Sequence, residues 1–268
     1  MATQTAYAHR VHQSGFSMVE LMVALAIGSM LTLVVAQLFA NTRSTNRSQE
    51  EAARMQENTR FALATIGRTV RLAGYKSNPN ATTTTIFPVA TAPALTGSDV
   101  ASPGSDTLIV RFQGSGTAAG AADNTVLDCL GTAVAPDYTG TNTFSYNRFS
   151  ISAGANGNNA LFCQTNSADP TAGTELVSGI DAMQVLFGED TSSPTDSVPD
   201  RFIAPGTAGI NMDNVVTVRV YLLISSVQSV RLDNSSATYT LAGQDYTYTD
   251  LKLRRVATTT IALRNRVP

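Results

Sequence analysis

The chain has 268 residues, with 18 lysines and arginines against 20 aspartates and glutamates, so its net charge is −2. This balance gives no bias toward nucleic acid or toward an acidic substrate. Only 14% of the residues are charged, which suits a secreted, strand-and-loop domain with an anchor better than a charged cytosolic enzyme.

The N-terminal segment predicts a retained membrane-spanning helix. Residues 1–15 are polar, and residues 16–40 are nearly all apolar, with Glu20 as the one charged side chain. As a helix the apolar run is roughly 37 Å long, enough to cross a hydrocarbon layer of about 30 Å. A conventional signal peptide has a shorter apolar core that ends in a small-residue cleavage site. Here a small residue, Gly15, precedes the run instead.

Residues 41–74 continue this helix as an amphipathic half. Apolar and small side chains recur there at steps of three and four residues, which places them on one stripe of a helix. Gly74 gives a C-terminal stop signal, so the pattern predicts one helix from about Phe16 to Ala73. The stripe consists of Ala52, Met55, Thr59, Ala62, Leu63, Ile66, Val70 and Ala73.

The amino-acid composition changes after residue 74, and residues 75–268 predict a β-rich head domain. Residues 76–106 are rich in Thr, Pro, Ser, Asn and Gly and are interpreted as loops. Short β-branched and aromatic runs follow, which are typical of strands. We therefore predict an α+β fold, with the long N-terminal helix packed on a mostly antiparallel sheet. The predicted strands are 107–112, 125–130, 143–151, 160–164, 180–187, 215–224 and 251–263.

The stretch GFSMVEL at 15–21 resembles the class III signal of type IV prepilins. The resemblance implies that 1–15 is a leader peptide, which a membrane-embedded aspartic peptidase removes by cutting after Gly15. The same enzyme then methylates the new amine of Phe16. The family more often has Thr and Leu where this chain has Ser17 and Met18, while the glycine, the phenylalanine and the glutamate are all present.

Glu20 has an assembly role in this interpretation. An ionised carboxylate at the centre of a membrane helix costs roughly 3 kcal/mol or more. Pairing with the Phe16 amine of a neighbouring subunit would offset that cost and would set the axial register of the two helices. In an ordinary single-span protein, Glu20 would lie at the headgroups, about 6 Å along the helix from Phe16. That alternative explains neither the leader nor Gly15.

Later segments are similar to PilW-type minor pilins. The resemblance implies a low-abundance subunit with a pilin-like head, which helps to initiate or prime type IV pilus assembly and sits near the tip. Its implied partners are other minor pilins, the major pilin, a tip adhesin and the prepilin peptidase. It also implies an inner-membrane anchor, a periplasmic head and later incorporation into the extracellular pilus. The similar segments are 55–75, 129–131, 147–149, 161–163, 180–188 and 259–266.

The cysteines leave three alternatives: a metal pair, a redox pair or a disulfide. Both histidines, His9 and His12, precede the cleavage site, so the mature chain would contain none. Two thiolates without histidine make a poor zinc site, and the wide spacing of Cys129 and Cys163 is not a CxxC redox motif. An oxidising periplasm favours the disulfide.

An acidic loop at 188–200 carries Asp190, Asp196 and Asp200. Relatives often have a denser Asp/Gly run here that is similar to a calcium loop. This chain lacks DxDxDG spacing, so a solvated acidic loop is favoured over a calcium site with these three ligands. The sequence indicates no other cofactor.

Phe61 and Leu72 lie nearly opposite the apolar stripe. Off-stripe apolar residues usually indicate wider burial within the same domain. In a filament, this second face of the helix would instead meet neighbouring subunits. Both interpretations stay open.

Four functions follow from these patterns. The later segments favour a pilus minor pilin over a minor pseudopilin of a type II secretion system. A membrane-anchored enzyme has little support, because the mature chain would lack histidine and the sequence has no GxSxG nucleophile motif. A tip-exposed module that binds surfaces or DNA is neither supported nor excluded.

Overall fold

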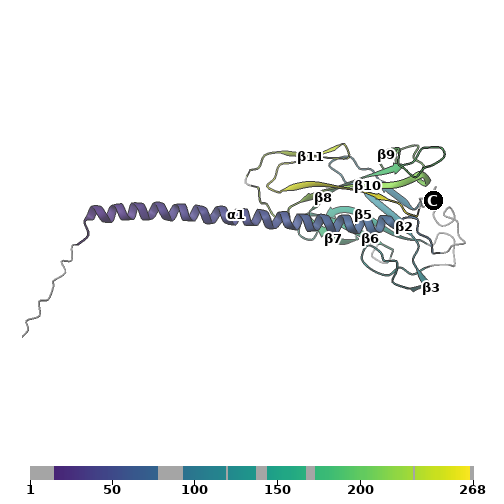
Figure 1. The fold of residues 1–268 in the computed structure, drawn as a ribbon, viewed down its shortest axis with the longest axis horizontal. Helices are drawn as coiled ribbons and strands as arrows, with labels where there is room; N and C mark the ends of the chain where they lie inside the picture. Colours follow the sequence, from purple (N-terminus) through teal and green to yellow (C-terminus); the bar gives the residue numbers. More distant parts are fainter. Residues whose placement is uncertain are drawn as a thin grey trace, which may run out of the picture. The chain divides into compact units, whose positions relative to one another are not determined.

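The protein is described from a computed structural model that covers residues 15–77, 93–118, 120–136, 144–166, 173–231 and 233–265. The chain divides into two compact units, Met1–Arg47 and Ser48–Pro268, and each is described by itself. Figure 1 colours the ribbon along the sequence and labels α1 and most of the strands. The elements in chain order are α1 Met18–Arg71, β1 Leu95–Ser98, β2 Thr107–Phe112, β3 Gly116–Ala118, β4 Ala121–Ala122, β5 Ser145–Ala153, β6 Asn159–Thr165, β7 Thr174–Ser178, β8 Ile180–Glu189, β9 Arg201–Ile203, the 3₁₀ turn η1 Met212–Asn214, β10 Val215–Ser225, β11 Ala237–Leu241, β12 Gln244–Tyr248 and β13 Arg254–Ala262.

In the first unit, α1 presents apolar side chains that no other part of the unit covers. Every residue from 18 to 43 is exposed, including Met18, Leu25 and Phe39. By length and composition α1 is the one helix in the described residues that could cross a membrane. An all-round apolar helix without protein cover needs an apolar surrounding, as the sequence predicts.

In the second unit, α1 buries one face against the head. The predicted stripe is confirmed at Met55, Ala62, Ile66, Val70 and Ala73, which are at most 7% exposed. The prediction is wrong for Ala52, which is exposed, whereas its polar neighbour Glu51 is buried. The helix ends at Arg71, and Gly74 follows with a φ of 72°, a left-handed conformation that favours glycine.

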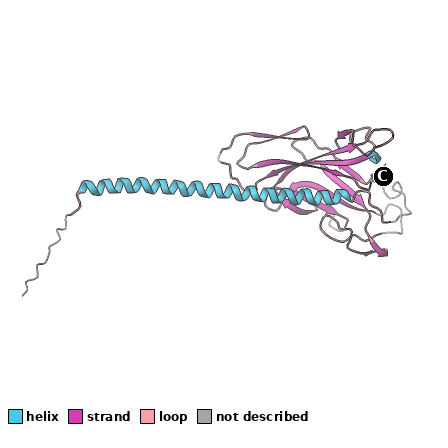
Figure 2. Ribbon diagram, in the orientation of Figure 1, coloured by secondary structure: helices cyan, strands magenta, loops and turns pink. Residues whose placement is uncertain are grey.

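Two antiparallel sheets form the body of the head. The first has the strand order β1-β2-β5-β6-β7, and the second has the order β13-β10-β8-β9. Two further hairpins, β11–β12 and β3–β4, complete the described strands. Figure 2 shows the strands beside the C-terminal half of the helix. The predicted α+β fold, a long helix with antiparallel sheets, is confirmed.

One apolar cluster joins the helix to both sheets. It contains Ile66 and Val70 of α1, Phe149 of the first sheet, and Val220 of the second, each with no exposed surface. A smaller cluster packs Tyr246 and other residues of the β11–β12 hairpin on the second sheet. Each sheet thus buries an apolar face within a shared core, which is the usual solution for a layered domain.

The off-stripe helix residues separate into two cases. Leu72 is half-buried and packs against the main core, so wider burial accounts for it. Phe61 remains 46% exposed on α1. The head therefore leaves one large aromatic side chain of the helix available to another surface.

The predicted strand at 125–130 is wrong. This segment makes only an isolated bridge, from Leu127 to Ala133. The carboxylate of Asp128 accepts hydrogen bonds from the backbone N–H groups of Leu130 and Thr132, both at 2.8 Å, and thereby turns the chain. An aspartate that bonds nearby backbone groups competes with strand pairing, which is why the apolar run does not extend.

A buried carboxylate, Asp106, connects the two sheets. It lies just before β2 and is 1% exposed. Its oxygens accept hydrogen bonds from the backbone N–H groups of Val100, at 2.9 Å, and of Val185 in β8, at 2.8 Å. Burial raises the pKa of Asp106 to about 6, because desolvation outweighs these two hydrogen bonds.

This raised pKa predicts a specific pH dependence. The folded state holds the Asp106 proton more tightly than the unfolded state, so its contribution is present below about pH 4 and is lost as the pH rises through about 6. At ~1.4 kcal/mol per pKa unit the expected loss is at most about 3 kcal/mol, because solvent screening reduces it. Urea unfolding from pH 3.5 to 7 would compare the wild type with Asp106→Asn. A stability difference that does not change with pH would contradict this assignment.

Candidate functional site: the N-terminal segment and the helix–head junction

Gly15 and Phe16 lie just before the helix, outside any regular secondary structure. Both are exposed, Phe16 by 87%, and no atom lies within 4 Å of the position where a side chain on Gly15 would begin. Helical structure begins only at Met18. The peptide bond between Gly15 and Phe16 is therefore free of helical hydrogen bonding and accessible to a peptidase cleft, although cleavage itself stays a prediction.

Ser17 and Glu20 form a capping box at the start of α1. The hydroxyl of Ser17 accepts from the backbone N–H of Val19 at 3.3 Å, and the Glu20 carboxylate accepts from the backbone N–H of Ser17 at 3.0 Å. This reciprocal pattern satisfies two N–H groups that the helix leaves free. The S-x-x-E spacing at 17–20 is a visible signal that our sequence analysis missed.

The capping box places the Glu20 carboxylate next to the predicted N-terminus of the mature chain. It lies 3.0 Å from the nitrogen of Ser17, and Phe16 is the preceding residue. One oxygen makes the capping bond, and a carboxylate can accept further hydrogen bonds. If Glu20 pairs with an amine, either its second oxygen makes that contact or the amine replaces the Ser17 N–H at the capping oxygen.

Cys129 and Cys163 form a disulfide, which confirms the predicted pairing. Both are buried, and their Cα atoms are 6.5 Å apart. The bond ties the turn after β4 to β6 in the first sheet. Closing a loop of this length stabilises a fold by about 4 kcal/mol on the chain-entropy model. Its role is structural.

The three aspartates of the 188–200 loop bond to the loop itself. Asp190 accepts from the backbone N–H groups of Asp196, at 2.9 Å, and Ser197, at 2.7 Å, and Asp200 accepts from that of Thr191 at 2.7 Å. The hydroxyl of Ser192 lowers the pKa of Asp190 by bonding its charged form. The described residues contain no group of three His, Cys, Asp or Glu side chains that could hold a metal ion. The solvated acidic loop, which the sequence favours over a calcium site, stays a prediction.

Glu51 anchors α1 to the head, a role that our sequence analysis missed. Its side chain is 3% exposed, and one oxygen accepts from the backbone N–H groups of Val227, at 3.0 Å, and Gln228, at 3.3 Å. The other oxygen lies 3.8 Å from the Arg54 guanidinium. The bonded loop is held in turn by Ser226, whose hydroxyl accepts from the backbone N–H of Leu253.

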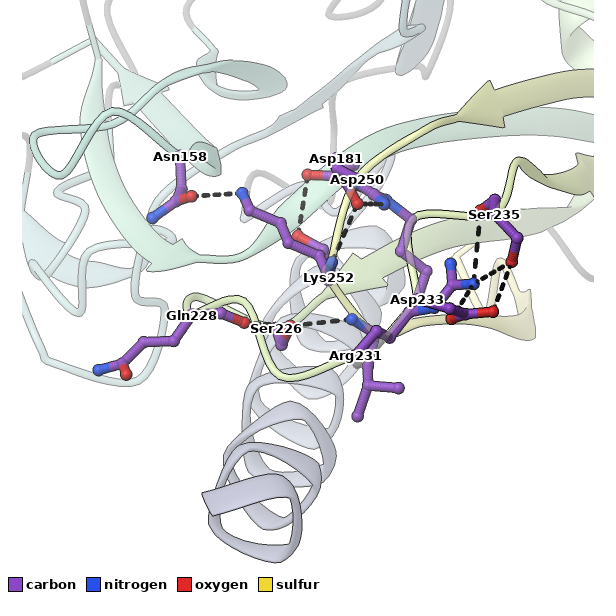
Figure 3. Close-up of polar contacts among 12 residues, drawn as sticks. Asn158, Asp181, Ser226, Gln228, Arg231, Asp233, Ser235, Asp250 and Lys252 are labelled. Atoms are coloured by element: carbon purple, nitrogen blue, oxygen red, sulfur yellow. Dashed lines mark hydrogen bonds and ion pairs between the residues drawn. The ribbon is translucent and has the colours of Figure 1, made fainter. Parts of the chain in front are cut away.

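A second polar network fixes the start of β13 (Figure 3). Arg254 donates to Asp181 at 2.6 Å and to both oxygens of Asp250, at 2.6 and 2.7 Å. Its guanidinium stacks on Tyr248 at 3.7 Å from the ring centre. Burial acts to lower the pKa of Arg254, but the hydrogen bonds to both carboxylates outweigh it and raise that pKa. The guanidinium therefore stays charged, and it remains bound to Asp181 and Asp250.

Two parts of the chain match known family models. Residues 10–36 match the model described as the prokaryotic N-terminal methylation motif, and residues 148–265 match the model described as type IV pilus-assembly protein W. These two matches support a type IV pilin of the PilW type. The methylation motif spans the capping box of this pilin, and the PilW match extends from β5 to just beyond β13. The apolar N-terminal helix accordingly fits a membrane anchor.

Other comparisons add little to this assignment. A type IV-like pilin from Thermus thermophilus is similar in structure, with 14% sequence identity and a TM-score of 0.46, over 80% of this chain and 98% of the Thermus chain. No curated protein sequence matches this pilin.

The Glu51 contact predicts a measurable loss of stability. Glu51→Ala leaves two backbone N–H groups without their acceptor, so we expect the free energy of unfolding to fall by roughly 2–4 kcal/mol. Glu50→Ala is the matched control, because Glu50 is exposed and Arg54 is its one ion-pair partner among the described residues, and it should cost less than about 1 kcal/mol. Circular dichroism of the full chain in detergent during urea unfolding measures both. Equal losses would show that the Glu51 contact adds no stability.

Proposed function

We propose that this pilin is a minor subunit that helps to initiate type IV pilus assembly and is incorporated near the pilus tip. The observation that carries the proposal is the PilW match over residues 148–265 of the head, because the N-terminal methylation motif is common to pilin-like chains in general. The head would contact other minor pilins, the major pilin and a tip adhesin. No part of this role requires catalysis by the chain.

The proposed assembly pathway gives each of the two units of the chain a separate role. The exposed apolar half of α1 holds the chain in the inner membrane, with the head in the periplasm. The prepilin peptidase cuts after Gly15 and methylates Phe16. The same apolar half then leaves the lipid and packs against neighbouring helices, so one surface serves first as anchor and then as filament contact. Phe61, which the head leaves exposed, would add to that contact.

The first prediction of this proposal concerns processing. In cells that contain the peptidase, the mature chain should begin at Phe16 and carry an N-methyl group, because the Gly15–Phe16 bond lies outside the helix and is exposed. Mass analysis of the N-terminal peptide measures this directly. Residues 1–15 still attached in assembled pili would overturn the proposal.

The second prediction concerns the charge of Glu20. Glutamine keeps a capping-box acceptor at this position but removes the charge, whereas leucine removes both. If the charge pairs with a neighbour's Phe16 amine, Glu20→Leu should keep a normal membrane level with reduced piliation, and Glu20→Gln should be similar or milder. Complementation of a deletion strain, scored for the subunit in membranes and in sheared pili, measures both.

Ser17→Ala is the matched control for the capping box. It removes the hydroxyl acceptor while leaving the Glu20 charge in place, and a lost helix cap costs about 1 kcal/mol. Wild-type piliation with both Glu20 variants would refute the pairing mechanism. A defect shared by Glu20→Leu and Ser17→Ala but absent from Glu20→Gln would assign the role to the cap instead of the charge.

A further inference from the structure

A groove of about 890 Å³ lies in the second unit between α1 and β13. Its helix wall comes from one face of α1, and its strand wall comes from the first part of β13. The lining residues include Ala52, Ala53 and Gln56 of the helix, and Arg255, Val256 and Thr258 of the strand. The groove therefore has an edge strand on one side and, on the other, a helix face that includes two alanines.

The strand wall is an open sheet edge. β13 pairs only with β10. Leu253 and Leu263 bond to the β10 side through their backbone groups, so odd-numbered residues face β10 and even-numbered residues, such as Val256 and Thr258, direct their N–H and C=O groups outward. Within the described residues these outward backbone groups have no backbone hydrogen bond.

This edge differs in length from the other sheet edges. The other outer strands of the two larger sheets are β1, β7 and β9, with 4, 5 and 3 residues, whereas β13 has 9. Short edge strands are one way in which proteins avoid unwanted strand pairing. A long edge that is left open is a template for an added strand.

The helix wall of the groove is exposed at a position where the apolar stripe predicts burial. Ala52 belongs to the apolar stripe, yet it is exposed, and it lines the groove together with Ala53. Met55 and Thr59 of the same stripe also reach the groove. Two alanines allow a neighbouring backbone to approach closely, and the open edge of β13 on the opposite wall fits an extended segment.

The charge of the groove selects an acidic occupant. Three arginines line it, and no carboxylate does. Arg254 is bound by Asp181 and Asp250, and Arg60 pairs with Glu57 at 3.0 Å. The exposed guanidinium of Arg255 makes no ion pair with any described residue.

We propose that an extended segment of a different pilus subunit, carrying a carboxylate, adds to the outer edge of β13 and fills this groove. The outward N–H and C=O groups of Val256 and Thr258 supply the strand pairing, and Arg255 binds the carboxylate. This inference rests on the proposed function, which supplies other subunits as partners. The occupant is not β13 of a second copy, because the direction of β13 within the head does not suit that pairing.

β13 runs in the same direction as the head part of α1. Residue 261 lies near Gly67, and the Asn265 side chain donates to the carbonyl of Arg71, beyond the groove around residues 49–60. Antiparallel pairing of two β13 strands would turn one copy end over end. The Ser48 ends, where each head joins its own anchor, would then lie at opposite ends of the pair, which does not suit two chains in one membrane.

The test uses the full chain in cells and a proline at the open edge. Thr258→Pro removes one outward N–H and leaves the β10 pairing intact, since proline is tolerated on edge strands at such positions. Thr258→Val keeps the N–H and is the matched control. Arg255→Glu reverses the free charge, and Arg264→Glu, an exposed arginine after β13, is its control.

The readout is the amount of other minor pilins that co-purifies with the detergent-solubilised chain, per unit of chain in the membrane. We expect a loss of at least tenfold for Thr258→Pro and several-fold for Arg255→Glu, with both controls at wild-type level. Hydrogen exchange of the Val256 and Thr258 amides in the wild type should slow at least tenfold in the complex relative to the free chain. Odd-numbered amides of β13 should stay protected in every variant that folds.

Three outcomes would overturn the strand addition: wild-type co-purification of Thr258→Pro, fast exchange of the outward amides in the complex, or their protection by a second copy alone. Arg255→Glu and the exchange measurement decide the matter if Thr258→Pro does not fold. If the wild-type chain is found in pili but these tests fail, the proposed function stands and the strand addition at the groove is refuted. A wild-type chain that never enters pili would refute the proposed function itself.

Discussion

The head depends on the buried face of α1 between Glu51 and Val70. Each sheet has an apolar face that must leave water, and both faces contribute to one cluster with Ile66 and Val70 of the helix. Burying one such side chain contributes about 1.5–3 kcal/mol, so several of them on one helix make up a large share of a typical domain's net stability. The helix is therefore a core element of the head and not merely its stalk.

The sequence predicts the features whose signals are local. An apolar run followed by a three- and four-residue stripe indicates α1, and β-branched runs indicate β2, β5, β6, β8, β10 and β13, because periodicity and propensity depend on near neighbours. The Gly15–Glu20 signal is equally local. The disulfide was predictable because the chain has only two cysteines and a secreted character.

Features that depend on distant partners were not predictable in this way. Glu51 interrupts an apolar stripe and would be expected to face water, and only the backbone of residues 227–228 explains its burial. Asp106 likewise gains its role from β8. The β11–β12 hairpin had a local signal that we missed: alternating Thr and Tyr around Ala242 and Gly243, both with positive φ.

Two buried polar contacts hold the walls of the α1–β13 groove in place. Glu51 fixes the rotation of the helix, and one residue later Ala52 faces the groove. On the other wall, Arg254 is held by Asp181 and Asp250, so the adjacent Arg255 begins from a fixed backbone. Binding to a preformed site costs less conformational entropy than ordering a mobile one. The same anchors that join helix and head thus also shape the surface that the head leaves uncovered.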